Sequence, residues 1–154
     1  MGRLRPLWTC PSCKRKFVTR NLWHSCVRRT ESDFLKGKSP QAVALYRKFK
    51  AVVKSCGPIL VVPVKTRIAF MVRVRFCGVW RMNANGIVAS FWITRRLHSR
   101  RFLKVECYGP ESYGYYLRIR SLRELDGQLL GWLKEAYRVG KQEHLQERTA
   151  RRAR

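Results

Sequence analysis

The chain has 154 residues, and 45% of them are hydrophobic, which is enough to bury one core with a small appendage. Its 34 Lys and Arg against 9 Asp and Glu give a formal net charge of +25. This composition excludes a disordered basic tail, and the apolar runs are too short to cross a bilayer. The excess charge predicts a polyanionic partner, foremost nucleic acid, and no membrane partner.

The acidic residues are unevenly distributed along the chain. Residues 34–105 contain sixteen Lys or Arg and no Asp or Glu. A metal-dependent nuclease gathers several carboxylates on one magnesium ion, so this scarcity argues against one. Catalysis by a site assembled from distant residues stays open, with a binding protein as the favoured interpretation.

Residues 1–27 contain a Cys/His motif typical of a zinc finger. Cys10 and Cys13 form a Cys-x-x-Cys pair, and His24 and Cys26 follow after ten further residues. A tight turn lets the first two thiolates face one ion, and the second pair completes a tetrahedron. We therefore predict structural zinc (Zn2+) held by all four side chains, with no position left for a substrate.

Other residues of this finger have expected roles as well. A redox Cys-x-x-Cys and chance clustering are the competing interpretations. The redox motif belongs within a larger α/β unit than nine preceding residues provide. Three aromatic residues are expected to cover the ion: Trp8, Phe17 and Trp23. Four cations of the finger loop are expected to contact phosphate: Lys14, Arg15, Lys16 and Arg20.

Beyond the finger, a polar linker is expected over residues 28–38, an α+β domain over 39–140 and a basic, frayed tail over 141–154. The domain opens with a helix, with Ser39 as its N-cap and Pro40 as its first residue. A final helix is expected to start at the capping box of Ser121 and Glu124. Between the helices, five β-like runs predict a mostly antiparallel sheet: 59–64, 67–76, 87–96, 103–107 and 115–120.

Alternation within these runs places cations and aromatic rings on one face of the predicted sheet. This mixture is typical of single-strand binders, and a helix covering the same face is the competing interpretation. The turn near His98 is the densest basic segment. The nucleic-acid contacts expected from the sheet and this turn are Arg73, Arg75, Trp92, Arg95, Arg96, Arg100, Arg101, Lys104, Tyr116, Arg118 and Arg120.

Several segments resemble an uncharacterised bacterial domain, the domain-of-unknown-function family numbered fifty-six fifty-five. The segments are Val64–Phe70, Phe76 and the ending from Leu125-Asp126 through Ala136–Gly140, and the resemblance covers roughly residues 40–140. The Cys/Cys/His/Cys finger is similar to one found ahead of that domain in some members. The resemblance implies a nucleic-acid setting and a protein partner such as a nuclease, and it supplies no catalytic residues.

Together these patterns predict a cytoplasmic, zinc-stabilised nucleic-acid-binding accessory module with little sequence specificity. The cytoplasmic expectation follows because Arg3 and Arg5 lead into a polar finger and no signal peptide is visible. Two alternatives stay open. One is a protein-interaction or ribosome-associated adaptor, and the other is a nucleic-acid-processing enzyme.

Overall fold

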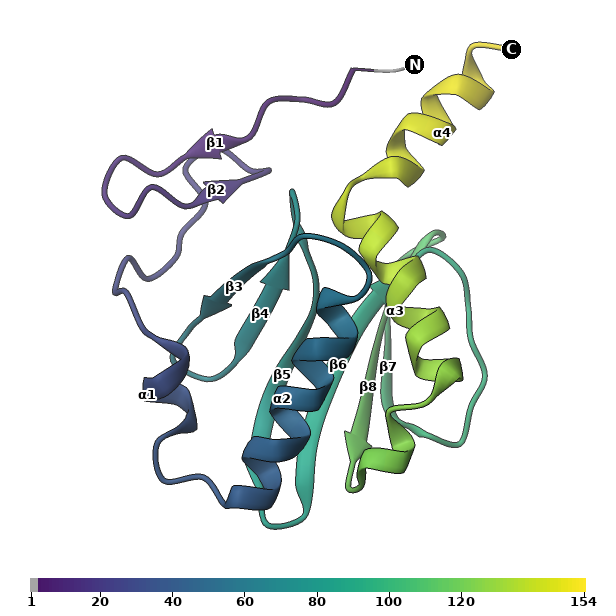
Figure 1. Cartoon of the computed structure of the whole chain (residues 1–154). Coiled ribbons are helices and arrows are strands. Elements are labelled where there is room, and N and C mark those ends of the chain that lie inside the picture. The colour runs from purple at the N-terminus through teal and green to yellow at the C-terminus, as the bar shows by residue number, and fades with distance from the viewer. Residues whose placement is uncertain (1–2) are drawn as a thin grey trace.

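The computed structural model describes residues 3–154, which form a small N-terminal finger and a larger α+β domain (Figure 1). In the finger, strand β1 (Trp8–Thr9) pairs with strand β2 (Lys16–Phe17) in antiparallel fashion. In the domain, helices α2 (Pro40–Lys54) and α3 (Gly127–Gly140) lie over one face of a six-stranded sheet. The α+β class expected from the sequence is confirmed.

The large sheet is antiparallel throughout, with strand order β3-β4-β5-β6-β8-β7. Its strands are β3 (Leu60–Pro63), β4 (Ile68–Met71), β5 (Arg75–Asn83), β6 (Gly86–Ile93), β7 (Phe102–Gly109) and β8 (Ser112–Ile119).

The sheet has one strand more than the five expected, because the run 67–76 is divided between β4 and β5. The division falls at residues 72–74, next to a register shift after Phe70. There the backbone amides of Arg73 and Val74 donate to the carbonyl oxygen of Gly140 at 2.9 and 3.1 Å. Alternating hydrophobicity cannot reveal this break, because the competing acceptor lies at the end of a distant helix.

The start predicted from sequence is correct for helix α2 and wrong for helix α3. Helix α2 begins as expected, since the Ser39 hydroxyl accepts a hydrogen bond from the amide of Ala42 at 3.2 Å. The expectation for α3 is wrong: the Glu124 carboxylate accepts from the amide of Ser121 at 2.8 Å, but this pair encloses only the short 3-10 turn η1 (Leu122–Glu124). Asp126 is the N-cap of α3 and accepts from Leu129 at 3.0 Å.

A short helix, α1 (Glu31–Leu35), lies within the segment expected to be a polar linker. The Thr30 and Asp33 side chains cap its start in reciprocal fashion. Glu31 joins α1 to α2, since its carboxylate accepts from the Tyr46 hydroxyl at 2.9 Å and pairs with Lys50 at 2.6 Å. A tertiary ion pair thus holds a segment whose local sequence is mainly polar.

The C-terminal segment also forms a helix, α4 (Glu143–Arg152), where a frayed tail was expected. Arg138 of α3 pairs with Glu143 at 2.9 Å and with Glu147 at 2.6 Å. These pairs bridge the last turn of α3 and the first turns of α4, which explains why a strongly basic segment is helical. Within residues 3–154, no helix combines the length and the apolar character needed to span a membrane.

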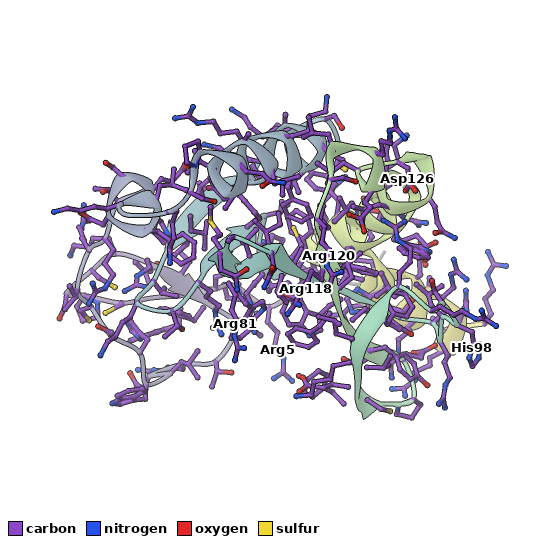
Figure 2. All side chains as sticks on the ribbon, turned by 90° about the horizontal axis from the view of Figure 1, so that it is seen from below. Arg5, Arg81, His98, Arg118, Arg120 and Asp126 are labelled. Atoms are coloured by element: carbon purple, nitrogen blue, oxygen red, sulfur yellow. The ribbon has the colours of Figure 1, made fainter. Side chains whose placement is uncertain are left out.

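The core lies between the sheet and the two helices. From α2, the ring of Phe49 lies 6.1 Å from that of Phe70 on β4. From α3, Trp132 stacks on Phe91 of β6 with their centroids 5.7 Å apart. Both helices therefore pack on the same face of the sheet, and Figure 2 shows Arg81 and Arg118 on the other side. We call the face of the sheet opposite α2 and α3 the open face.

Candidate metal centre and candidate nucleic-acid interface

Cys10, Cys13, His24 and Cys26 come together in the finger, with their ligand atoms all within 4.8 Å of one another. The two sulfurs of Cys10 and Cys26 are 3.8 Å apart, and the Nε2 atom of His24 lies 3.3 Å from the Cys13 sulfur and 3.5 Å from the Cys26 sulfur. A tetrahedral ion with ordinary bonds to sulfur and nitrogen separates two sulfurs by about 3.8 Å and a sulfur from a nitrogen by about 3.6 Å. The four side chains therefore fit one tetrahedral metal ion.

Local backbone geometry positions these ligands. The amide of Cys10 donates to the carbonyl of Arg15 and the amide of Lys14 donates to the carbonyl of Cys10, both at 2.9 Å, which closes the turn that aims the first two thiols inward. The Nδ1 atom of His24 lies 2.6 Å from the carbonyl oxygen of Leu22. That bond places the proton on Nδ1 and leaves the Nε2 lone pair free for a metal.

Aromatic rings cover one side of the metal centre. The Phe17 ring lies 4.3 Å from the His24 ring, and the Trp8 ring lies 6.3 Å from it. The expectation for Trp23 is wrong, because that side chain is 91% exposed. Trp8 and Phe17 are register partners on β1 and β2, whereas Trp23 lies in a segment without regular secondary structure, so no strand holds it against the ion.

The electrostatics of the finger favour a thiolate at Cys13. Burial opposes ionisation of this thiol, but hydrogen bonds from the backbone and side chain of Arg15 and from His24 outweigh burial and lower its pKa to about 6. Thiolates are the form that binds metal. Arg15 also donates to the carbonyl of Ser25, so this expected phosphate contact has an internal partner as well. The side chains of Lys14, Lys16 and Arg20 are exposed, with Lys14 just before strand β2, Lys16 on it and Arg20 after it.

Three aromatic side chains form a contiguous group on the open face. Trp80 of β5 and Trp92 of β6 flank Tyr116 of β8, with ring centroids 5.8 Å and 6.5 Å from that of Tyr116. All three are half-buried. These rings, named the aromatic patch here, are joined by small residues of the same face, Ser90 and Gly114, which are register partners of Tyr116 and Trp92.

Cations lie directly on the aromatic patch. The guanidinium of Arg75 lies 4.6 Å from the ring centre of Trp92, that of Arg67 lies 4.3 Å from Trp80, and the ammonium of Lys104 lies 5.6 Å from Tyr116. Arg118 shares this face through its register with Val88. The structure therefore brings together five of the expected side chains, Arg75, Trp92, Lys104, Tyr116 and Arg118.

Other expected contacts lie elsewhere. Arg73 is engaged away from the aromatic patch, donating to the Gln142 side chain and to the carbonyl of Arg5. Arg95 pairs with Glu135 of α3 at 2.7 Å. In the turn near His98, the side chains of Arg96 and Arg100 are exposed, and Arg120 is exposed just beyond β8.

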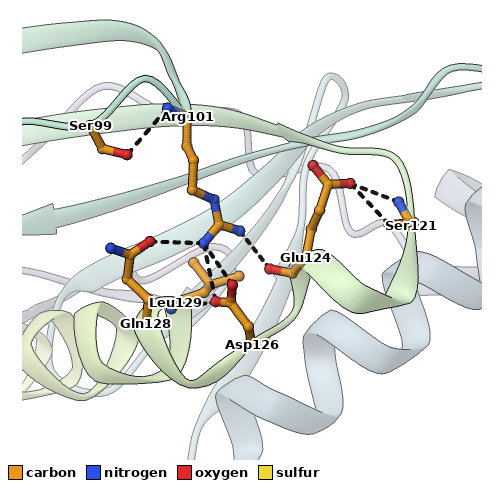
Figure 3. Close-up of polar contacts among 7 residues, drawn as sticks. All are labelled: Ser99, Arg101, Ser121, Glu124, Asp126, Gln128 and Leu129. Atoms are coloured by element: carbon orange, nitrogen blue, oxygen red, sulfur yellow. Dashed lines mark hydrogen bonds and ion pairs between the residues drawn. The ribbon is translucent and has the colours of Figure 1, made fainter.

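Arg101 is held inside the protein's own polar network (Figure 3). Its guanidinium donates to both carboxylate oxygens of Asp126 at 3.1 and 3.2 Å and to the Gln128 side chain at 3.2 Å. It also donates to the carbonyl of Glu124 at 2.5 Å. These bonds tie the residue preceding β7 to the N-terminus of α3, so Arg101 has a structural role.

Two members of the open-face group, Arg67 and Trp80, were not identified from the sequence. The strand β5 shifts register between Val79 and Arg81, so Trp80 falls at a bulge where simple alternation fails. Arg67 precedes β4 and reaches Trp80 on the adjacent strand. Of these two residues, only Trp80 could have been noticed in the sequence, because it is a large aromatic residue between two of the expected β-like runs.

The carboxylates of the chain are all engaged. Asp33 and Glu124 cap helical turns. The others form ion pairs: Glu31, Glu106, Glu111, Asp126, Glu135, Glu143 and Glu147. Seven cations account for these pairs, so 27 of the 34 Lys and Arg have no ion-pair partner within residues 3–154. The positive charge of this protein is largely free to meet an external anion.

Comparison with known families identifies the larger domain. Residues 31–140 match the model of a family described as Domain of unknown function (DUF5655). The match covers most of the chain, and the chain belongs to this family. Neither the curated proteins nor the solved structures gave a significant match.

Proposed function

We propose that this chain is a nucleic-acid-binding accessory module with little sequence specificity, whose finger is built on structural zinc (Zn2+). The observation that carries the proposal is the open face, where two arginines without a carboxylate partner among the described residues, Arg67 and Arg75, lie against the rings of Trp80 and Trp92. Lys104, which pairs with Glu106, lies against the neighbouring Tyr116 ring. Phosphate contacts from such cations supply affinity and carry no base information. A cytoplasmic setting belongs to the same proposal, since it keeps thiolate ligands reduced.

Zinc is the metal that this donor set favours. Three thiolates and one imidazole suit a borderline-soft ion with tetrahedral geometry, and the ligand-to-ligand distances agree with zinc bond lengths. Because protein side chains fill all four positions, the ion would hold the finger's shape and bind no substrate.

Binding at different salt concentrations tests the proposal. The protein should retain labelled DNA or RNA on a filter at low ionic strength, and its Kd should rise by at least about tenfold between about 50 and 200 mM salt, because phosphate binding releases counterions. Absence of retention of either nucleic acid at low salt contradicts the proposal.

A pair of charge reversals locates the interface. Arg118→Glu changes the open face, and Lys48→Glu changes the exposed side of α2, which packs on the other face of the sheet. Both variants lower the net charge equally, so long-range attraction falls to the same extent. The first should raise Kd by about tenfold and the second by no more than about twofold. Equal effects would place the interface elsewhere.

The finger supports a second candidate function, that of a protein-interaction adaptor. Trp23 is 91% exposed, and Val18, Leu22 and Val27 are exposed beside it in sequence. Apolar side chains gathered on so small a lobe suit a protein surface. The family resemblance suggests a nuclease as the partner. In this case Trp23→Ser should abolish co-purification of a protein partner after nuclease treatment and leave the Kd for nucleic acid unchanged.

A further inference from the structure

The open face presents flat stacking surfaces as well as charge. Trp80, Tyr116 and Trp92 lie side by side on adjacent strands, and the indole nitrogen of Trp80 donates to the Ser90 hydroxyl at 2.6 Å, which fixes the plane of that ring. Gly114 lies beneath Trp92, so closely that an added Cβ would be 2.8 Å from the indole nitrogen. The rings are therefore held in place by the sheet.

Two arginines of this face, Arg67 and Arg75, lie over neighbouring rings and have no carboxylate partner among the described residues. Burial lowers the pKa of Arg75, and burial together with the nearby charge of Arg75 lowers the pKa of Arg67. The Nε atom of Arg67 is buried, with no hydrogen-bond partner among the described residues. Both guanidinium groups remain protonated at neutral pH, and neither forms an ion pair among the described residues, so a bound anion would compensate charge that the protein leaves unpaired.

The chemistry of this surface distinguishes single strands from duplexes. A duplex exposes its phosphates and base edges but hides the faces of its bases, so the rings would have no base face to stack on. A single strand exposes both its bases and its phosphates. Bases can stack on an aromatic ring or on the guanidinium plane that covers it, as at Trp92 with Arg75.

From these contacts we infer that the open face binds single-stranded nucleic acid in preference to duplex, with bases stacked on the aromatic patch and phosphate held between Arg67 and Arg75. The inference rests on the proposed function and specifies its ligand. Trp80 also borders a cleft of about 510 Å³ whose lining includes Lys36, Lys38, Lys65 and Arg81. The only carboxylate of that lining, Asp33, is engaged at the cap of α1. The cleft continues the cationic path for the strand beyond Trp80.

The inference is tested with the full, zinc-loaded chain and two labelled probes, an oligothymidylate of about 20 nucleotides and a duplex of equal length containing the same strand. At equal salt, the single strand should bind at least about tenfold more tightly. Trp92→Leu removes a stacking ring and should raise the single-strand Kd by about 5- to 100-fold, while Trp92→Phe keeps an aromatic face and should stay close to the parent.

The outcomes separate the inference from the function on which it rests. If neither probe binds, the proposed function fails and the inference fails with it. If the duplex binds as tightly as the single strand, or if Trp92→Leu and Trp92→Phe bind alike, nucleic-acid binding stands and the inference is overturned. Thermal melts accompany each variant, and Trp80→Leu with Trp80→Phe supplies a second matched pair if a Trp92 variant does not fold.

Discussion

Arg101 illustrates how one side chain can join two elements. Its bonds to Asp126, Gln128 and the carbonyl of Glu124 connect the residue before β7 to the start of α3, and its guanidinium also lies 5.7 Å from the ring centre of Trp132. Asp126 also accepts the capping bond from the amide of Leu129, a bond in which Arg101 takes no part. The contribution of Arg101 is therefore separable from that of the helix cap.

We expect Arg101→Ala to lower the free energy of unfolding by about 1 to 2 kcal/mol, since several charged hydrogen bonds are lost at a partly exposed site. Urea unfolding measures this loss. Arg100→Ala removes an exposed neighbour and should change stability by less than about 0.5 kcal/mol. If both substitutions leave the unfolding midpoint unchanged, the network in Figure 3 contributes no stability.

At the scale of elements, helix α4 depends on contacts that the rest of the fold supplies. His144 is half-buried, and its Nδ1 atom has no hydrogen-bond partner among the described residues. It faces a small cleft that is also lined by Thr94, Glu111, Glu147, Arg148 and Arg151. Burial first, and then the charge of Arg148, lower the pKa of His144, with Glu111 and Glu147 opposing the shift.

The lowered pKa predicts the pH dependence of α4. In the undocked state His144 takes up a proton near its ordinary pKa of about 6.5, whereas in the docked state it does so only at lower pH. The stabilisation is therefore complete above about pH 6.5 and is lost as the pH falls through the pKa of the docked state. Hydrogen exchange of α4 amides, referenced to α2 amides, should show this loss. His144→Gln should remove the pH dependence, and its persistence in that variant would assign it to another group.

At the scale of the whole molecule, the finger and the domain have separate cores. The buried cluster of the domain consists of residues between Ala42 and Ala136 and includes no finger residue. The finger has little to bury apart from the surroundings of Cys10 and Cys13. A lobe this small would depend on a metal bound by its four ligands for folding.

Removal of the metal should therefore unfold the finger alone. Cys13→Ser, or treatment with a chelator, should collapse the amide resonances of residues 8–26 and leave those of residues 40–140 in place. Metal content and two-dimensional NMR spectra measure the two effects. Cys107→Ser is the matched control, because Cys107 is an exposed cysteine outside the metal centre. Loss of the domain resonances together with those of the finger would show that the two lobes fold as one unit.

The candidate metal centre could be predicted from sequence because its geometry is local. All four ligands lie within 17 consecutive residues, and a turn plus a short hairpin is enough to bring them together. Helix α2 could be predicted from the sequence equally well, since its signals are local: Ser39 as the N-cap, Pro40 as the first residue, and the apolar spacing that follows. The start of α3 at Asp126 could not be predicted, because the pair Ser121 and Glu124 is a competing local signal for a helix start.

The open face could be predicted from the sequence only in part. Alternation within single strands was sufficient to place Trp92, Tyr116 and Arg118 on one side, because side chains of a strand point to opposite faces in turn. Tertiary structure alone decided which face the helices cover, moved Trp80 to that side through a bulge, and brought Arg67 onto its ring. It also decided which arginines meet carboxylates, since ion pairs join residues far apart in the chain, as Arg101 and Asp126 are.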